Sequence, residues 1–310
     1  LTVQYLKSKS LNRKNIKHVS DTVFDIERDE TGTVKKIICS DHIIEGDIFI
    51  DCTGYKRIFS SKSDWVSFKD NLPMNSVTTF TRKHRESMVT KADKLKLGWC
   101  WQIPTQERLG CGYVSCDEWG DDIIDEIKFN YSDAEIVKSF KFESGKLKKS
   151  WNHNVISLGL AYHFLEPLQA TNIHLTLVQI DMLCQKCIRD TKDRTLNPNV
   201  ISYYNKHIDN LIEDFKNFIN IHYSCDTRVK MTDYNNEIID LLKVRGLFHE
   251  DILQAYGSCG IQLWGHTLLG LNHLTKQDCH TFLSEMNSYD EVKEVSSELE
   301  DTFTNTPFLT

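Results

Sequence analysis

The 310-residue chain is poor in glycine and in positive charge, and it has no long apolar run. Its 14 glycines fall below the average share of roughly 7%, and none forms the G-x-G-x-x-G pattern of a dinucleotide-phosphate loop. With 37 Lys and Arg against 44 Asp and Glu, the formal charge is −7, and no basic stripe could follow a phosphate backbone. Neither a bilayer-spanning segment nor a secretory leader is recognisable. We therefore expect a soluble, cytoplasmic protein that binds neither nucleic acid nor membranes.

Ten cysteines at scattered spacings are better interpreted as intracellular thiols, most of them buried, than as a disulfide framework. A second interpretation concerns Cys184, Cys187, His222 and Cys225, which together could bind zinc tetrahedrally and make the chain a zinc-stabilised interaction module. However, Cys184 and Cys187 also fall on the apolar stripe of a predicted helix.

Two α/β units can be recognised in the sequence. Residues 19–26 and 34–39 have the composition of two strands joined by a turn, which predicts a hairpin. The apolar run 48–50 predicts a strand buried on both faces, and residues 155–159 predict a second buried strand. From Thr171 onward, apolar residues recur at helical spacing. The members of this predicted buried stripe are Ile173, Leu177, Ile180, Cys184 and Cys187.

The middle and the end of the chain differ in their predicted structure. Residues 77–115 mix aromatic residues with paired glycines and predict strands, whereas the capping-box spacing of Ser132 and Glu135 predicts the start of a helix. A long amphipathic helix is predicted after Pro198, and further helices follow to about Val295. The apolar face of the helix after Pro198 would consist of Ile201, Tyr204, Ile208, Leu211, Phe215 and Phe218. The last residues, 296–310, are polar enough for a frayed tail.

The strongest local signal is a pair of tryptophans at alternate positions. Trp99 and Trp101 lie in the sequence Gly98-Trp-Cys-Trp-Gln-Ile-Pro104, which is followed by Arg108, Gly110, Gly112 and Tyr113. On a strand, both indoles would face the same side, where they can line a cavity or fill a core. Residue statistics favour the core.

The same motif carries a family resemblance. Trp99-x-Trp101-x-Ile103-Pro104 resembles the W-x-W-x-I-P signature of the flavin-dependent tryptophan halogenase family. Residues 49–55, Phe-Ile-Asp-Cys-Thr-Gly-Tyr, resemble a strand end in its flavin domain, and residues 158–174, with Phe164-Leu-Glu-Pro-Leu168, resemble its loop and helix beside the flavin ring. Residues 218–223 are similar to a weaker helical element of the family.

The resemblance implies an α/β fold. Residues 1–75 and 152–192 would form part of a Rossmann-like FAD-binding domain of the flavin monooxygenase type. Residues 76–151 would be a strand-rich insertion that carries the tryptophan motif, and 193–310 a helical C-terminal region.

The resemblance also implies a halogenation reaction. Reduced FAD, supplied by a separate flavin reductase, would react with dioxygen and a halide ion, and the oxidised halogen would then reach an indole or another small aromatic substrate. Such an electrophile must be kept from water and confined to one route. Tryptophan side chains are suited to lining that route.

Particular residues receive roles from this resemblance. The start of the helix at Thr171 and Asn172 would bind the halide ion through backbone N–H groups and the helix dipole. The predicted catalytic residues are Gln169, Trp99 and Trp101, and the predicted cofactor-binding residues are Asp51, Thr53, Gly54, Gly159, Glu166 and Pro167. Asp51 could instead cap the turn that follows it. His163 would be either a proton carrier or a hydrogen-bonded structural histidine.

The chain also departs from the family pattern. Gln169 stands where the family commonly has a second glutamate, and an amide can neither hold a negative charge nor take up a proton. Asn172 stands where glycine or serine is frequent. We expect the phosphate loop and the catalytic lysine of the family to precede Leu1. Two alternative functions follow: a flavin-dependent monooxygenase, or a catalytically impaired flavin-binding homologue.

Overall fold

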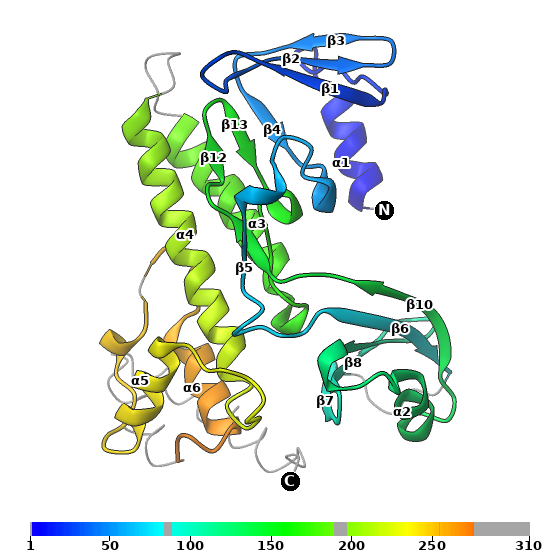
Figure 1. Ribbon diagram of the computed structural model, residues 1–310, viewed down its shortest axis with the longest axis vertical. Helices are drawn as coiled ribbons and strands as arrows, with labels where there is room; N and C mark the ends of the chain where they lie inside the picture. The colour runs from blue at the N-terminus through cyan, green and yellow to red at the C-terminus, as the bar shows by residue number, and fades with distance from the viewer. Residues whose placement is uncertain (1, 84–88, 189–196, 254, 276–310) are drawn as a thin grey trace.

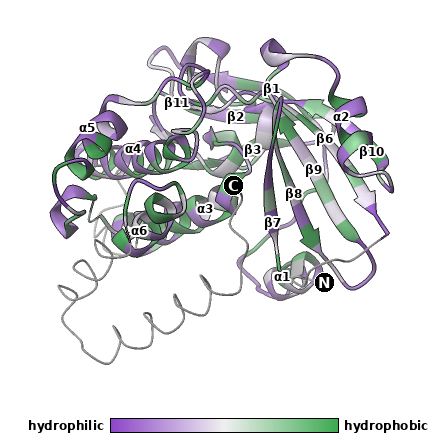
Figure 2. Ribbon diagram, turned by 90° about the horizontal axis from the view of Figure 1, so that it is seen from below, coloured by the Kyte–Doolittle hydropathy of each residue, from purple (hydrophilic) through white to green (hydrophobic). Residues whose placement is uncertain are grey.

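The computed structural model describes residues 2–83, 89–188, 197–253 and 255–275, and Figure 1 shows their arrangement. A small sheet and α1 lie at the top, a second sheet lies at the bottom right, and α4 runs along the left side between them (Figure 1). Viewed from below, the helices α3 to α6 lie on one side of the molecule and the larger sheet on the other (Figure 2). The predicted α/β architecture is confirmed.

The top of the molecule contains the predicted hairpin. Strands β1 (Val23–Arg28) and β2 (Val34–Cys39) pair antiparallel, and β3 (Ile43–Glu45) pairs with β2. Asp29 organises the turn because its Oδ1 accepts hydrogen bonds from the backbone N–H groups of Thr31 and Thr33, both at 3.0 Å. The helix α1 (Thr2–Leu11) precedes this sheet.

A small mixed sheet lies below the hairpin. The strand β4 (Phe49–Asp51) pairs in parallel with β13 (Val155–Ser157), which pairs antiparallel with β12 (Trp151–Asn152). Both predicted strands are confirmed, but the expectation that the first is buried on both faces is wrong. Ile50 is 51% exposed because its face of β4 is not covered by the residues that the structure describes.

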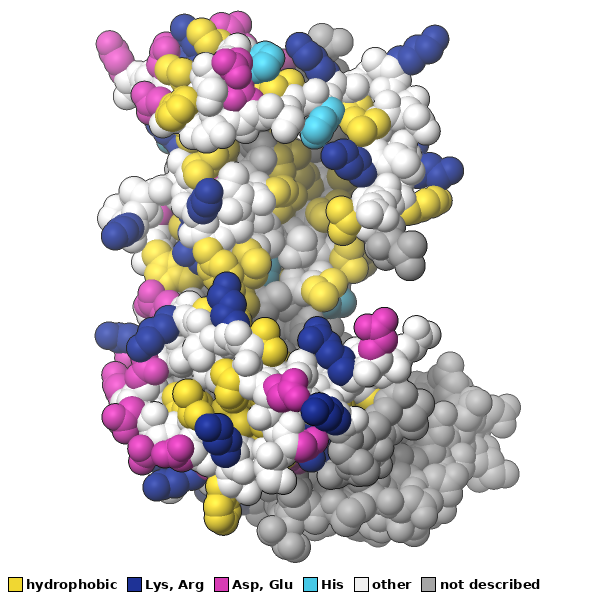
Figure 3. Space-filling model, turned by 90° about the vertical axis from the view of Figure 1, so that its right-hand side faces the viewer, with side chains coloured by type: hydrophobic (Ala, Val, Ile, Leu, Met, Phe, Trp, Pro, Cys, Tyr) yellow, Lys and Arg dark blue, Asp and Glu magenta, His cyan; other side chains and the backbone are white. Residues whose placement is uncertain are grey.

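Short strands connect this sheet to the lower half of the molecule. The strand β11 (Gly145–Leu147) pairs with both β5 (Trp65–Ser67) and β14 (His163–Phe164). Figure 3 shows apolar side chains gathered at mid-height on one side of the molecule, between its upper and lower parts.

A five-stranded antiparallel sheet lies within residues 76–141, inside the segment predicted as a strand-rich insertion. Its order is β10-β6-β9-β8-β7. The strands are β6 (Ser76–Arg82), β7 (Lys91–Leu95), β8 (Gly98–Pro104), β9 (Leu109–Ser115) and β10 (Glu135–Lys141), and helix α2 (Ile123–Asn130) packs on them. The predicted helix start at Ser132 and Glu135 is wrong. β-Branched and aromatic residues follow it, and the segment pairs with β6, so tertiary pairing overrides the capping pattern.

Helices dominate the last part of the described chain. They are α3 (Thr171–Asp181) with a π-helical extension (Met182–Ile188), α4 (Pro198–Ile221), α5 (Asp233–Leu242) and α6 (Ile261–Gly270). The helix α4 begins as predicted, because the Asn197 side chain accepts a hydrogen bond from the Asn199 N–H at 2.9 Å and Pro198 occupies the first turn. The helix predicted toward Val295 and the polar tail lie outside the described residues.

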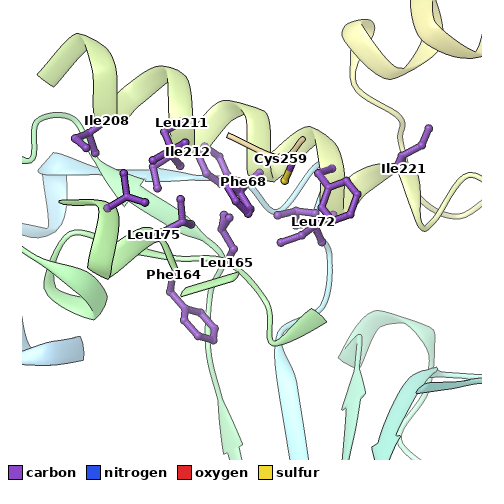
Figure 4. Close-up of a cluster of buried hydrophobic side chains, with 14 of the residues drawn as sticks. Phe68, Leu72, Phe164, Leu165, Leu175, Ile208, Leu211, Ile212, Ile221 and Cys259 are labelled. Carbon is purple, nitrogen blue, oxygen red and sulfur yellow. The ribbon is translucent and has the colours of Figure 1, made fainter. Parts of the chain in front are cut away.

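The main core forms around α4. Tyr204, Ile208, Leu211, Phe215 and Phe218 are all buried, as the periodicity predicts, and Ile201 is partly buried. Figure 4 shows α4 side chains that face Leu165 and Leu175, with Phe68 and Leu72 close by. One apolar face therefore joins segments from Phe68 to Leu274 of the described chain.

The predicted buried face of α3 is mostly wrong. Ile173, Leu177 and Ile180 are exposed, with Ile173 at 70%, and Cys184 is exposed as well. The buried side of the helix instead carries Leu175, Val178, Met182, Leu183 and Cys187. Both stripes are apolar, so periodicity alone could not tell which one faces α4.

The structure also bears on the cysteines and on membrane-spanning helices. The nine cysteines in the described part of the chain are free thiols, and six of them are buried. No helix among the described residues is long and apolar enough to span a membrane.

The packing of α4 gives a stability prediction. Leu211→Ala should lower the free energy of unfolding by about 2 to 5 kcal/mol, because it removes buried methyl groups and leaves a cavity. Tyr203→Ala on the exposed face of the same helix is the matched control, with an expected change within about 0.5 kcal/mol. Urea denaturation followed by circular dichroism measures both, and equal losses would contradict the assigned core.

Candidate functional site

The candidate site begins where two parallel strands end. Ser157 on β13 is paired with Asp51 on β4, and the Leu158 N–H donates to the Asp51 carbonyl at 3.0 Å. Because the strands are parallel, their carboxyl ends lie at the same edge of the sheet. The segment after β4, with Thr53 and Gly54, therefore lies beside the turn that begins at Gly159.

Asp51 has one bonded and one unbonded carboxylate oxygen. Its Oδ1 accepts hydrogen bonds from the Thr53 backbone N–H at 2.9 Å and the Thr53 hydroxyl at 2.7 Å, so the predicted turn cap is present. Its Oδ2 is buried without a partner among the described residues. Such an oxygen is costly unless a ligand or water satisfies it. Gly54 has φ +65°, and an added Cβ there would meet nothing within 4 Å.

The Gly159 turn is fixed to α3. Its N–H donates to the buried Gln179 side chain at 3.0 Å, and its φ is +54°. A Cβ at this position would lie 3.0 Å from the Thr176 hydroxyl, so the turn and the helix are in close contact. Gly159 therefore allows both the left-handed backbone and this close approach.

Glu166 is a fully buried carboxyl group that contacts the end of α4. Its Oε1 accepts a hydrogen bond from the Tyr223 hydroxyl at 2.5 Å, and its Oε2 has no partner among the described residues. Burial raises the pKa of Glu166 to about 8, although the bond from Tyr223 opposes the shift. At neutral pH the group is therefore mostly protonated. Pro167, which follows it, is partly buried.

The backbone between Pro167 and α3 is strained. Gln169 (φ 59°, ψ 10°) and Ala170 (φ 52°) both have left-handed conformations that non-glycine residues rarely adopt. Both residues are exposed. The Gln169 Nε2 lies 3.4 Å from the His222 Nε2, at the C-terminal end of α4. The two left-handed residues lie between Pro167 and the start of α3, and the Gln169 side chain lies beside His222.

The helix α3 begins at Thr171, as the sequence predicts. Its N-cap residue, Ala170, has no side-chain acceptor, so no side chain caps the first N–H groups. Thr171 is buried, and its hydroxyl has no hydrogen-bond partner among the described residues. Uncapped N–H groups and the positive end of the helix dipole favour an anion at this position.

The side chain of Asn172 forms hydrogen bonds within the loop that precedes α3. Its Oδ1 accepts from the Leu165 N–H at 3.0 Å, and its Nδ2 donates to the Leu165 carbonyl at 2.8 Å. The side chain therefore holds the 165–172 loop closed. Only the backbone of Asn172 remains for the predicted halide contact.

The tryptophan pair lies at the edge of the main core. Trp99 is buried, Trp101 is partly buried, and their ring centroids are 6.0 Å apart. Trp101 covers Gly112 so closely that an added Cβ would meet its ring at 2.0 Å. Burial and the neighbouring Glu166 raise the pKa of the Tyr223 hydroxyl well above its usual value, and the nearby Trp99 indole opposes this shift.

Tyr223 therefore joins parts of the site that are distant in the sequence. It contacts Glu166 in the loop, and Trp99 from the insertion lies next to it. No sequence pattern assigns a role to Tyr223 itself. The signals that could have found it are the resemblance of residues 218–223 to a helical element of the family and its place directly after the long amphipathic helix.

His163 does not show the hydrogen bond predicted for a structural histidine. The ring is completely buried, and neither ring nitrogen has a hydrogen-bond partner among the described residues. Burial lowers the pKa of His163 to about 3, so the ring is neutral at physiological pH. The predicted structural hydrogen bond is therefore not formed within the described chain.

The zinc interpretation receives no support from the side-chain positions. Among the described residues, no three His, Cys, Asp or Glu side chains are arranged to hold a metal ion. Cys187 is buried, whereas Cys184 and Cys225 are exposed, and the His222 Nδ1 lies 2.8 Å from the Phe218 carbonyl.

Comparison with known proteins places the chain in a family. The family model described as tryptophan halogenase matches residues 1–243. The chain belongs to the tryptophan halogenase family. The resemblance carried by the tryptophan motif and the two flavin-side stretches is thereby confirmed.

Individual relatives of this family are distant in sequence. The tryptophan 6-halogenase ThaL of Streptomyces albogriseolus is 26% identical over 241 residues, which cover 73% of this chain and 44% of the relative. The tryptophan 7-halogenase RebH of Lentzea aerocolonigenes is 25% identical, over 74% of this chain and 45% of the relative. The chain spans about half the length of the curated relatives it matches.

Solved structures show the same fold. The tryptophan 6-halogenase SttH of Streptomyces toxytricini superimposes with a TM-score of 0.78 at 22% identity, over 98% of this chain and 64% of that one. BrvH, a flavin-dependent halogenase from Brevundimonas sp. BAL3, gives 0.77 at 20% identity, over 99% and 66%.

Glu166 gives a prediction on pH dependence. Between about pH 4.5 and pH 8 the folded state keeps a proton that the unfolded state loses, so stability should fall as the pH rises through this window. Glu166→Gln cannot ionise and should remove that slope, which is at most about 1.4 kcal/mol per pH unit. Denaturant titrations at several pH values measure it. Parallel pH profiles for the two proteins would contradict the protonated, buried carboxyl group.

Proposed function

We propose that this chain forms part of a flavin-dependent halogenase, which uses reduced FAD, dioxygen and a halide ion to halogenate an indole or another electron-rich arene. The observation that carries the proposal is the uncapped start of α3 at Thr171, next to the loop whose Glu166 accepts a hydrogen bond from Tyr223, which belongs to the same buried cluster as Trp99. An anion site beside an apolar wall is what a halide-dependent reaction on an aromatic substrate requires.

Several residues would hold FAD at the shared strand edge. The unbonded oxygen of Asp51, the open space at Gly54 and the tight turn at Gly159 suit a ligand rich in hydroxyl and amide groups. Thr53 positions the Asp51 carboxylate, and Glu166 and Pro167 begin the loop beside the predicted flavin ring. When bound, reduced FAD would supply the reaction with dioxygen that oxidises the halide ion. A separate flavin reductase would deliver it.

The remaining residues would orient the reactants. The first N–H groups of α3, at Thr171 and Asn172, would bind the halide ion. Trp99 and Trp101 would exclude water from the route of the oxidised halogen, and Trp101 is the more accessible of the two. Gln169 favours a second candidate, a hydroxylating monooxygenase or an impaired homologue, because it replaces the carboxylate at this point.

A direct assay tests the proposal. We expect the protein expressed from its complete reading frame, with FAD, a reductase and NADH, to add chlorine or bromine to at least one member of an indole panel. Mass spectrometry would detect this by the halogen isotope pattern. A product that gains oxygen instead would establish the monooxygenase alternative, and flavin turnover without any modified arene would establish the impaired homologue.

FAD binding tests the strand-edge site separately. Gly54→Ala should weaken binding of FAD by the complete protein at least about tenfold, because the added methyl group occupies the open space at the edge and strains a φ of +65°. Gly260→Ala is the control, since Gly260 also has open space around it but lies at the start of α6 with an ordinary φ. Titration calorimetry measures both. Equal affinities for all three proteins would place FAD elsewhere.

A further inference from the structure

The ring of His222 is fixed by two neighbours at the C-terminal end of α4. Its Nδ1 lies 2.8 Å from the Phe218 carbonyl oxygen, which can only accept a hydrogen bond, so Nδ1 carries the proton. The ring packs edge-on against Phe218, with centroids 5.0 Å apart and an interplanar angle of 87°. In the neutral ring, Nε2 is then left with a free lone pair.

That lone pair is directed at Gln169. The Nε2 of His222 lies 3.4 Å from the Gln169 side-chain nitrogen, which is a donor, so the contact agrees with an unprotonated Nε2. Gln169 is exposed and His222 is partly exposed, so a ligand can approach both. Burial lowers the pKa of His222, although the Phe218 and Ile219 carbonyls oppose the shift, and the ring is therefore neutral at physiological pH.

We propose that Nε2 of His222 is the proton acceptor of the halogenation site, in place of the carboxylate that Gln169 cannot provide. This inference rests on the proposed function. The ring presents an unprotonated nitrogen at the one position where the loop has exchanged a charged acceptor for a neutral amide. A histidine needs no negative charge to accept a proton, which distinguishes it from the glutamate it replaces.

The proton transfer can be written in full. The oxidised halogen, as hypohalous acid, forms a bond to an arene carbon, its O–halogen bond breaks, and the hydroxide that leaves takes a proton from solvent and becomes water. The C–H bond at that carbon then breaks, its electron pair returns to the ring, and the proton moves to His222 Nε2, which later releases it to solvent. The sum is arene and hypohalous acid going to haloarene and water.

Other titratable groups connect to this end of α4. The Cys225 thiol donates to the His222 carbonyl, Lys94 contacts Cys225 and lies 4.0 Å from Asp226, and Glu166 bonds to Tyr223. None of these contacts involves the Nε2 atom of His222. The Cys225 thiol reaches only the backbone of His222, and Glu166 is fully buried.

The first test measures the tautomer in the 310-residue chain. Long-range ¹H–¹⁵N correlation spectra at pH 7.5 should show His222 protonated at Nδ1 and unprotonated at Nε2, with the signal assigned by its loss in His222→Asn. His207 should show the opposite tautomer, because its Nε2 lies 3.1 Å from the Tyr256 carbonyl. A His222 ring protonated at Nε2 would overturn the inference whatever the activity of the protein.

The second test uses the protein expressed from its complete reading frame. His222→Asn keeps an amide that can donate to the Phe218 carbonyl but removes the base, so kcat should fall about 10²-fold or more with KM for the arene nearly unchanged. His207→Asn is the control and should keep the kcat of the wild type. Adding Gln169→Glu to His222→Asn should raise kcat at least tenfold above that of His222→Asn alone, because the glutamate supplies an acceptor at the same place.

The outcomes separate this inference from the proposed function. The rate of the wild type should fall at low pH as the imidazole becomes protonated, and this limb should be missing in His222→Asn. An active wild type with an equally active His222→Asn would overturn the inference alone. A wild type that halogenates no arene in the panel would overturn the proposed function, and the role of His222 with it.

Discussion

The parallel pairing of β4 with β13 is the constraint on which the site depends. These strands are held together by their ladder and by the Leu158 N–H, which donates to the Asp51 carbonyl. A parallel pair requires a long crossover, and here the crossover includes the whole five-stranded sheet. The segment that brings the chain from one strand to the other is thus the one that carries Trp99 and Trp101.

A second junction fixes where that insertion lies. Tyr223, at the end of α4, donates to Glu166, and Trp99 from β8 packs into the same core. Three segments far apart in the sequence meet at one buried hydroxyl group. A buried polar contact of this kind is costly to break, because the carboxyl group would lose its only partner among the described residues. The geometry of the loop before α3 therefore depends on α4, although the two segments are distant in the chain.

The sequence predicted those features that local patterns determine. The run around Phe49, the start of α4 at Pro198 and the start of α3 at Thr171 follow from apolar runs, capping residues and family motifs. Predictions from the sequence were wrong where packing or pairing with another segment determines the structure. Residues from Glu135 form a strand because β6 is available to pair with them, and α3 buries Leu175 rather than Ile173 because α4 packs on that side. The Asn172 bonds to Leu165 depend on loop closure, which no local pattern encodes.

The exchange at Gln169 shows how sequence and structure inform each other. Residue chemistry alone predicts a loss relative to the family's glutamate, since an amide cannot accept the proton that a carboxylate accepts. Whether the site has another acceptor depends on the tautomer of His222, and that depends on the Phe218 carbonyl one helical turn earlier. In the last turn of a helix, carbonyls lack the regular helical donor four residues later, and the Phe218 carbonyl can bond a side chain instead. The two residues directly after α4, His222 and Tyr223, therefore provide both the nitrogen that faces Gln169 and the hydroxyl group that holds Glu166.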